Sequence, residues 1–205
     1  TSGGIDVYFD SAALGADLIV PINRVKLHTD FVGDIQSGVC KMLVIGLGNH
    51  VGCTAVHEAD FDNFADILIE AAGMIMKHAS VGFGVAILEN AYDETAMIEA
   101  VPAEKIIERE KELVKIAKDN MPTLMIPDID VLIVEEIGKN ISGSGFDPNI
   151  LGKSFLLKKF VLPVPEIKRM VLFDVTDESH GNAVGVGIFD VITRKVLNKL
   201  DLPLM

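Results

Sequence analysis

Apolar residues along the chain form short continuous runs and longer stretches with helical spacing. The continuous runs predict buried strands over residues 18–22, 42–46, 83–88, 95–101, 128–134 and 169–175. Apolar positions recur every three or four residues over 61–78 and 103–121, which predicts two helices with one buried face each. A third helix is expected over 183–200. The many charged residues of 103–121 are most simply a solvent-exposed helix face.

Strands separated by helices are typical of a mostly parallel sheet that is covered on both faces. Pro122 interrupts the helical pattern and marks a boundary near residues 121–123. We therefore expect an α/β fold with two lobes of mostly parallel sheet covered by helices, and a cofactor cleft between them. The first lobe is expected to span residues 1–121 and the second 122–205. Both ends resemble cuts through a longer sequence, so we expect the second lobe to be truncated.

The composition limits the partners and the cellular location that we expect for this protein. The 205 residues are 49% hydrophobic and carry a formal net charge of -12, and an acidic surface repels the phosphates of nucleic acids. Two cysteines cannot form a disulfide framework, which favours a reducing, cytoplasmic location. No apolar run reaches the roughly 18 residues of a membrane helix, and no signal peptide is visible. We expect neither a nucleic-acid nor a membrane partner, and the oligomeric state stays open.

Two glycine-containing segments look like nucleotide-binding loops. Residues 143–154 (GSGFDPNILGKS) end in Gly-Lys-Ser, but Asp147 occupies the position where a phosphate loop requires its first glycine. A turn between a strand and a helix is the simpler interpretation. Residues 46–52 (GLGNHVG) resemble a dinucleotide fingerprint whose last glycine is one residue late, which keeps a nicotinamide-dependent dehydrogenase as an alternative.

Chemically active side chains gather between residues 25 and 58. Histidine transfers protons near neutral pH and binds nickel, copper, zinc or iron, and lysine forms covalent bonds through its nitrogen. The spacing fits neither a structural zinc site nor a Ser-His-Asp triad. His78, on the helix 61–78, is most simply structural, and His180 lies in a polar turn. The cluster comprises His28, Asp30, Asp34, Gln36, Ser37, Lys41, His50 and His57.

The order of these residues resembles the nickel-dependent lactate racemase family. The matching segments are residues 17–28 (DLIVPINRVKLH), residues 37–41 (SGVCK) and His57, followed in the second half by residues 147–152 (DPNILG). The resemblance implies that Lys41 is joined covalently to a nickel-pincer nucleotide, that His57 binds the nickel, and that His28 is a catalytic acid and base. It also implies that Asp147 and Asn149 contribute to cofactor binding. Cofactor-building enzymes are then expected partners.

The chain departs from the family pattern at several positions. Leu27 precedes His28 where the family has proline, and the loop from His28 to Lys41 is about three residues longer. Cys40 replaces an arginine, and Leu151-Gly152 replace a Tyr-Gln pair beside the substrate. A second acid/base histidine and a substrate-binding arginine of the family would precede Thr1, so this piece is expected to be inactive alone.

The resemblance predicts a racemase or epimerase of a small 2-hydroxy acid. In that chemistry the cofactor accepts a hydride from the substrate carbon and returns it to either face, while histidines move the hydroxyl proton. The alternatives are a family-like domain without catalytic activity and the nicotinamide-dependent dehydrogenase.

Overall fold

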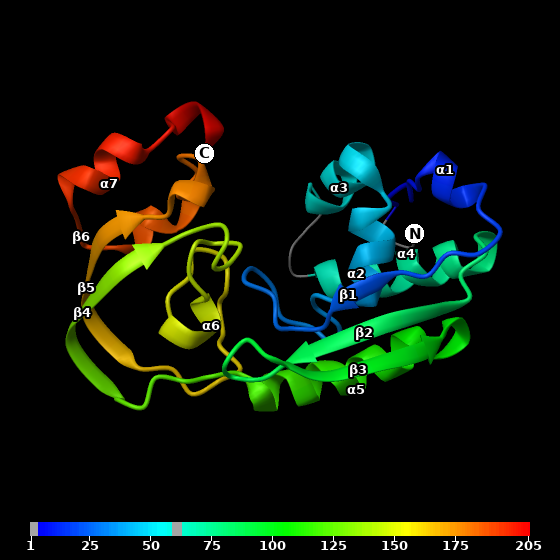
Figure 1. The fold of residues 1–205 in the computed structure, drawn as a ribbon, viewed down its shortest axis with the longest axis horizontal. Coiled ribbons are helices and arrows are strands. Elements are labelled where there is room, and N and C mark those ends of the chain that lie inside the picture. Colours follow the sequence, from blue (N-terminus) through cyan, green and yellow to red (C-terminus); the bar gives the residue numbers. More distant parts are fainter. Residues whose placement is uncertain (1–3, 59–62) are drawn as a thin grey trace. The chain divides into compact units, whose positions relative to one another are not determined.

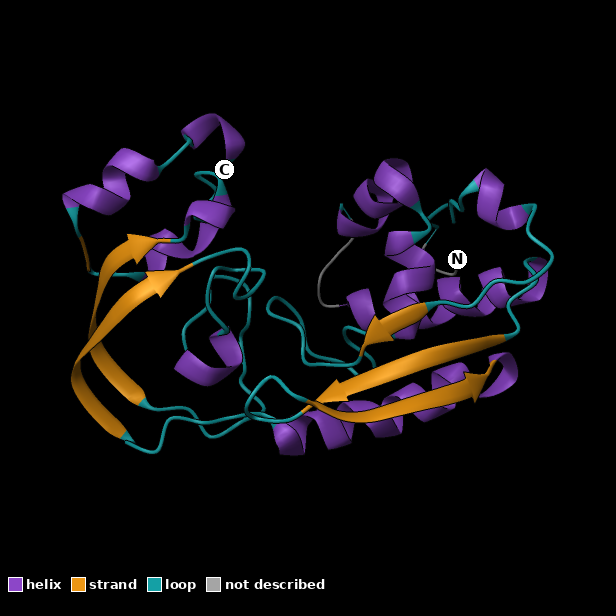
Figure 2. Cartoon of the chain, viewed as in Figure 1, coloured by secondary structure: helices purple, strands orange, loops and turns teal. Residues whose placement is uncertain are grey.

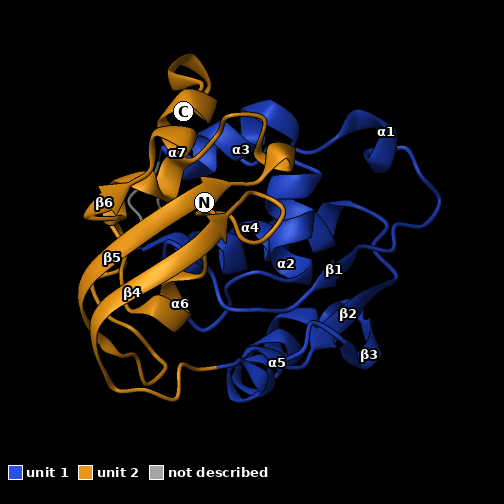
Figure 3. Ribbon diagram, turned by 60° about the vertical axis from the view of Figure 1, so that its left-hand side comes forward, with its two compact units in different colours: residues 1–122 blue, residues 123–205 orange. Residues whose placement is uncertain are grey.

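The computed structural model describes residues 4–58 and 63–205, which divide into two compact units. Figure 3 shows residues 1–122 and 123–205 in different colours. The division follows Pro122, within the segment where the helical pattern of the sequence is interrupted. Residues 61 and 62, at the start of the helix expected over 61–78, lie outside the described residues.

The first unit contains a three-stranded sheet in the order β1-β2-β3 (Figure 1). Its strands are β1 (Ile22–Arg24), β2 (Phe83–Glu89) and β3 (Thr95–Pro102). β1 pairs with β2 in parallel, with Asn23 opposite Ala86, whereas β2 and β3 are antiparallel. The strand expected over 18–22 therefore begins later, and its earlier part contributes only a parallel bridge between Ile19 and Val81.

Helices cover this sheet, as the ribbon in Figure 2 shows for α5 beneath β2 and β3. α4 buries residues at intervals of three and four, from Phe64 to Ile75, and Met121 ends α5 by adopting an extended backbone. The helical elements are α1 (Ser11–Leu14), α2 (Val39–Lys41), the π-helical turn η1 (Met42–Gly46), α3 (Asn49–His57), α4 (Phe64–His78), the 3-10 turn η3 (Ala103–Lys105) and α5 (Ile106–Asn120).

The strand expected over residues 42–46 is wrong. This segment is the π-helical turn η1, which continues α2 and leads into α3. A short run of fully apolar residues has no period that distinguishes a strand from a buried helix, so the packing of the whole unit decides. Leu43 and Val44 are buried, and η1 contacts α2, α3 and α4.

The second unit is built on a fully parallel sheet in the order β4-β5-β6. Its core includes Ile137, Phe146, Met170, Leu172 and Val196. The elements are β4 (Asp128–Ile137), α6 (Pro148–Leu151), β5 (Glu166–Val175), β6 (Val191–Ile192) and α7 (Arg194–Lys199), with 3-10 turns at Asp177–Ser179, Val184–Ile188 and Leu202–Leu204.

The single helix expected over residues 183–200 is wrong. The segment forms a 3-10 turn, the short strand β6 and the helix α7 in succession. Thr193 explains why the helix begins so late, because its Oγ1 accepts a hydrogen bond from the backbone N–H of Val196 and caps α7. Local capping chemistry thus divides a stretch that is apolar enough for one continuous helix.

The chain is therefore a mixed α/β protein with two small sheets, and only the sheet of the second unit is wholly parallel. That sheet is not covered on both faces by the described residues, because Val131, Ile133 and Phe173 are 46–58% exposed. In the described part of the chain no single helix is long and apolar enough to cross a membrane. One pair of helical segments, Val39–Gly46 and Asn49–His57, passes that test of length and composition only when taken together, and it is bent by 110°.

Candidate functional site

His28 and Lys41 lie in direct contact in the first unit. The distance from His28 Nε2 to Lys41 Nζ is 2.7 Å. His28 lies in the loop after β1, and Lys41 is the last residue of α2. The two ends of the intervening loop are tied together by a pair of backbone hydrogen bonds between Lys26 and Ser37, of 2.9 and 3.1 Å. This bridge brings the histidine and the lysine together although 13 positions separate them.

The loop holds His28 from both its backbone and its ring. The backbone N–H of His28 donates to Oε1 of buried Gln36 at 2.7 Å, and the N–H of Asp30 donates to His28 Nδ1 at 3.1 Å. The ring lies against Phe31, with 4.3 Å between the ring centroids, and Phe31 in turn packs on Phe64. The His28 ring is therefore fixed in position and orientation.

Burial lowers the pKa of His28 to about 3, and electrostatic effects of the neighbouring Lys41, His57 and Lys26 lower it further. His28 is thus a neutral imidazole at physiological pH. Burial also lowers the pKa of Lys41, against the opposing effect of the Asp30 carboxylate. A lysine in such a surrounding is a better nucleophile, because a larger share of its amines is uncharged.

A buried carboxylate supports the helix that carries Lys41. Glu110 of α5 is 2% exposed, and its Oε2 accepts a hydrogen bond from the backbone N–H of Cys40 at 3.0 Å. Its Oε1 has no hydrogen-bond partner among the described residues. A side-chain carbon at Gly38 would lie 2.4 Å from that oxygen, so the close approach of the carboxylate requires glycine there.

Burial raises the pKa of Glu110 to about 7, and the hydrogen bonds from the start of α2 offset part of that rise. Burial together with the Glu110 carboxylate also raises the pKa of the Cys40 thiol well above its usual range. Cys40 is therefore a poor nucleophile.

His57 lies at the end of α3, exposed to solvent. Its Nδ1 is 2.7 Å from the carbonyl oxygen of Cys53, so Nδ1–H donates and Nε2 carries the lone pair. Histidine ligands of metals commonly donate the other ring N–H in this way. Phe64 packs edge-on against the His57 ring at 5.2 Å, and it is also the neighbour of the His28–Phe31 pair. The three residues singled out by the sequence thus share one side of the first unit.

His78 is an instructive comparison on α4. Its Nδ1 is 2.9 Å from the carbonyl oxygen of Met74, the same spacing of four residues as between His57 and Cys53. The hydrogen bond alone therefore does not identify a metal ligand. What distinguishes His57 is its position near His28, whose pKa it lowers.

Asp147 and Asn149 lie in the second unit, where they shape the turn before α6. Asp147 caps α6, and its Oδ1 accepts hydrogen bonds from both the backbone N–H and the Nδ2 of Asn149, at 2.9 and 3.2 Å. Gly152 ends α6 in a left-handed conformation with φ of 65°. Both polar side chains thus have a local structural role, and the cofactor contact stays a prediction.

The Gly-Lys-Ser of residues 152–154 does not open a helix. Gly152 follows α6, and the Oγ of Ser154 accepts hydrogen bonds from the N–H groups of Leu156 and Leu157 within a loop. A phosphate loop needs the backbone N–H groups at the start of a helix. The segment therefore lacks the local geometry of a phosphate loop.

The glycines of residues 46–52 also lack the required context. Gly46 is the last residue of the π-helical turn η1, so no strand directly precedes these glycines, and Asn49 to Gly52 are already part of α3. A dinucleotide fingerprint depends on a tight turn from a strand into a helix. The described structure therefore removes the argument for the nicotinamide-dependent dehydrogenase.

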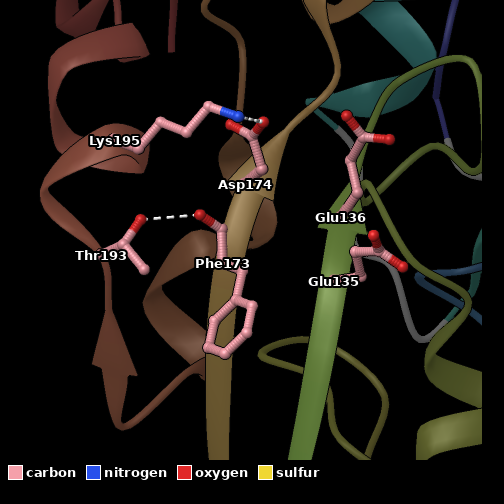
Figure 4. A pocket seen from close by; sticks show the side chains of 6 residues that line it. All are labelled: Glu135, Glu136, Phe173, Asp174, Thr193 and Lys195. Atoms are coloured by element: carbon pink, nitrogen blue, oxygen red, sulfur yellow. Dashed lines mark hydrogen bonds and ion pairs between the residues drawn. The ribbon is translucent and has the colours of Figure 1, made fainter.

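The second unit contains an open hollow of about 460 Å³ at the carboxyl ends of β4 and β5 (Figure 4). Lys195 forms an ion pair with Asp174, and Thr193 Oγ1 donates to the carbonyl oxygen of Phe173 at 2.6 Å. Glu135 and Glu136 line the other side. None of the predicted site residues lies in this hollow, and its carboxylates make it unsuited to an anion.

The remaining candidates are dispersed. Asp34 forms an ion pair with Lys111 of α5 at 2.9 Å, His50 is exposed near the start of α3, and His180 lies in a turn of the second unit. Within residues 4–58 and 63–205, no three His, Cys, Asp or Glu side chains are placed to hold a metal ion by themselves.

Sequence reasoning missed Glu110 and Phe64 as parts of this site. A signal for Glu110 exists, because it falls four residues after Ile106 and three before Leu113, on the apolar stripe of α5. Phe64 belongs to the expected buried face of its helix, but its contact with two histidine-bearing segments depends on the tertiary fold.

Comparison with protein-family models gives no match, and searches of curated proteins and of solved structures give none either. The fold and the site define a mixed α/β protein with a half-buried histidine–lysine pair. The resemblance to the lactate racemase family rests only on the sequence pattern described above.

Proposed function

We propose that the chain is part of a lactate-racemase-like isomerase, a racemase or epimerase of a 2-hydroxy acid that uses a nickel-pincer cofactor tethered to Lys41. The observation that carries this proposal is the 2.7 Å contact between Lys41 Nζ and His28 Nε2. A lysine with a lowered pKa suits covalent attachment, and a neutral histidine beside it suits proton transfer.

The residues present fit the cofactor. Lys41 offers an amine in a largely buried surrounding, and His57 directs its Nδ1–H to a backbone carbonyl, which leaves Nε2 as the nitrogen that binds metal. A single histidine suffices in this proposal, because the resemblance implies that the cofactor supplies sulfur ligands of its own. When bound, the cofactor would accept the hydride from the substrate carbon and return it.

The other steps belong to the protein. His28 Nε2 faces the attachment point, so His28 would hold the substrate oxygen there through its ring N–H and exchange a proton with it. Phe31 and Phe64 flank this region and limit the access of water to the histidine. A role of Asp147 and Asn149 in cofactor binding is proposed from the resemblance alone.

The test is to produce the chain together with cofactor-building enzymes, and to measure peptide mass and nickel content on one sample. We expect a mass adduct on the peptide that contains Lys41, with about one nickel per chain. Lys41→Arg is expected to lose both signals. His57→Gln is expected to keep the adduct and lose nickel, whereas the matched control His78→Gln is expected to keep both.

The absence of an adduct on Lys41 under these conditions would overturn the proposal and favour a domain without catalytic activity. Where the adduct forms, a screen of small 2-hydroxy acids for inversion of configuration at the substrate carbon, made with the full-length parent protein because this chain alone is expected to be inactive, identifies the substrate.

A further inference from the structure

The two hydrogen bonds on the His28 ring carry information about the charge of Lys41. The Asp30 N–H donates to Nδ1 at 3.1 Å, so Nδ1 holds a lone pair and not a proton. A neutral imidazole has one N–H, which must then be on Nε2. That N–H points to Lys41 Nζ at 2.7 Å.

A charged lysine does not fit this arrangement. An ammonium group has three N–H donors and no lone pair, so it could bond to His28 only if Nε2 were the acceptor. The ring proton would then be on Nδ1, facing the N–H of Asp30. Two donors directed at each other cost hydrogen-bonding free energy in a buried place.

We infer that Lys41 rests as an uncharged amine that accepts a hydrogen bond from the Nε2–H of His28. The role of His28 in the cofactor-free protein is then to keep this amine neutral and ready to react with an activated acyl carbon. The use of this reactivity for cofactor attachment rests on the proposed function, but the state of the amine does not.

The reaction that this state prepares is an acyl transfer. The Nζ lone pair forms a bond to the acyl carbon, and the leaving group departs with the electron pair of its own bond to that carbon. One proton is lost from nitrogen and goes to the leaving group. A charged lysine has no lone pair and cannot begin this step.

Other groups near the pair modify its charge but do not replace its hydrogen bonds. The carboxylate of Asp30 is 3.9 Å from Nδ1, beyond hydrogen-bonding distance. Among the described residues, the charged and titratable side chains that act on the pair include Lys26, Asp30, Cys53 and His57.

Nitrogen NMR of the cofactor-free chain at pH 7 tests the inference directly. In a sample labelled with ¹⁵N in histidine and lysine side chains, we expect His28 to show the Nε2–H tautomer. We expect the Lys41 Nζ resonance, assigned with Lys41→Arg, at the position of a neutral amine, apart from the resonances of the other lysines.

His28→Phe keeps a ring between Phe31 and Lys41 and removes the donor. We expect the Lys41 resonance to move toward the ammonium position in this variant, whereas the same exchange at exposed His78 leaves it unchanged. An ammonium resonance for Lys41 in the unsubstituted protein, or an Nδ1–H tautomer for His28, would overturn the inference. A neutral Lys41 that never gains a cofactor would instead leave the inference intact and contradict the proposed function.

Discussion

Lys41 of the first unit and Lys199 of the second both contact polar partners, but the partners differ in kind. Lys41 meets a neutral imidazole in a buried place, and its pKa is lowered. Lys199 lies 2.8 Å from Asp177 and 3.0 Å from Asp174, whose hydrogen bonds raise its pKa. The same residue type is thus prepared as a nucleophile in one unit and held as a structural cation in the other.

The difference shows why a lysine must be interpreted with its surroundings. Burial without a counter-charge disfavours the ammonium form, whereas carboxylates at hydrogen-bonding distance favour it. The second unit also has a hollow at the ends of its strands, where ligands commonly bind in α/β sheets. Lys195, the lysine at this hollow, forms an ion pair with Asp174 and so has surroundings unlike those of Lys41.

The largest expected effect is on reactivity. With a limiting amount of acetic anhydride at pH 7, Lys41 should be acetylated before Lys199, because only the neutral amine reacts and each unit of pKa changes its share about tenfold. The measurement is the ratio of acetylated to free peptide for each lysine by mass spectrometry.

The control for this experiment is acetylation in urea, where the unfolded chain should give both lysines similar rates. If Lys199 reacts ahead of Lys41 in the folded protein, the contrast between the two units is wrong.

Phe64→Ala tests whether the aromatic wall maintains the buried pair. Phe64 is fully buried, and truncation of such a residue costs about 3–5 kcal/mol of unfolding free energy. Water admitted to the cavity should also reduce the acetylation advantage of Lys41. Urea unfolding followed by circular dichroism measures the first effect, and the competition assay measures the second.

Phe146→Ala is the matched change in the second unit, where Phe146 packs edge-on against Phe189 at 5.7 Å between centroids. It should destabilise that unit and leave the reactivity of Lys41 unchanged. A loss of Lys41 reactivity in this variant would mean that the two units are not independent in the way that the comparison assumes.

Much of the scaffold of both units could be predicted from the sequence. The helices α4 and α5 follow from apolar spacing that is long enough to show its period, and β2, β3, β4 and β5 follow from their apolar runs. The segment Met42–Gly46 could not be predicted in this way, since five consecutive residues without a polar position fit a strand and a buried helix equally well.

The site was predictable in its residue types but not in its charge states. His28, Lys41 and His57 stand out by type and order, yet the contact between His28 and Lys41 depends on the Lys26–Ser37 bridge and on ring packing that no spacing reveals. The sequence predicts that the charged residues of α5 face the solvent. Glu110 is the one charged residue among the buried residues of this helix. Glu110 is buried because it lies on the apolar face of the helix, although glutamate is a charged residue type.

Glu110→Gln is expected to change the pH dependence of stability. Folding raises the pKa of Glu110 from 4.5 to about 7, so the folded state binds this proton more tightly than the unfolded chain. The associated stability is fully present below pH 4.5 and is lost as the pH rises to about 7, a change on the order of 3 kcal/mol. Glutamine has no such proton. The free energy of unfolding of Glu110→Gln, relative to that of the wild type, should therefore rise by about this amount between pH 4.5 and pH 8.

Urea unfolding at both pH values measures this gain, and Glu108→Gln on the exposed side of α5 is the control. A constant difference between Glu110→Gln and the wild type would show that the carboxyl group does not titrate in this range.

The smallest expected effect concerns the ion pairs of the second unit. Lys195 and Lys199 hold the pKa of Asp174 down to about 2, so the stability from this carboxylate is present above pH 4 and is lost as the pH falls toward 2. Its partners are largely accessible to water, and pairs of this kind contribute about 1 kcal/mol or less. Asp174→Asn should therefore lower the unfolding midpoint slightly at pH 7, and added salt should shrink the difference. A cost as large as that of Phe64→Ala would mean that the second unit also depends on a charge removed from water, and the contrast with the first unit would no longer hold.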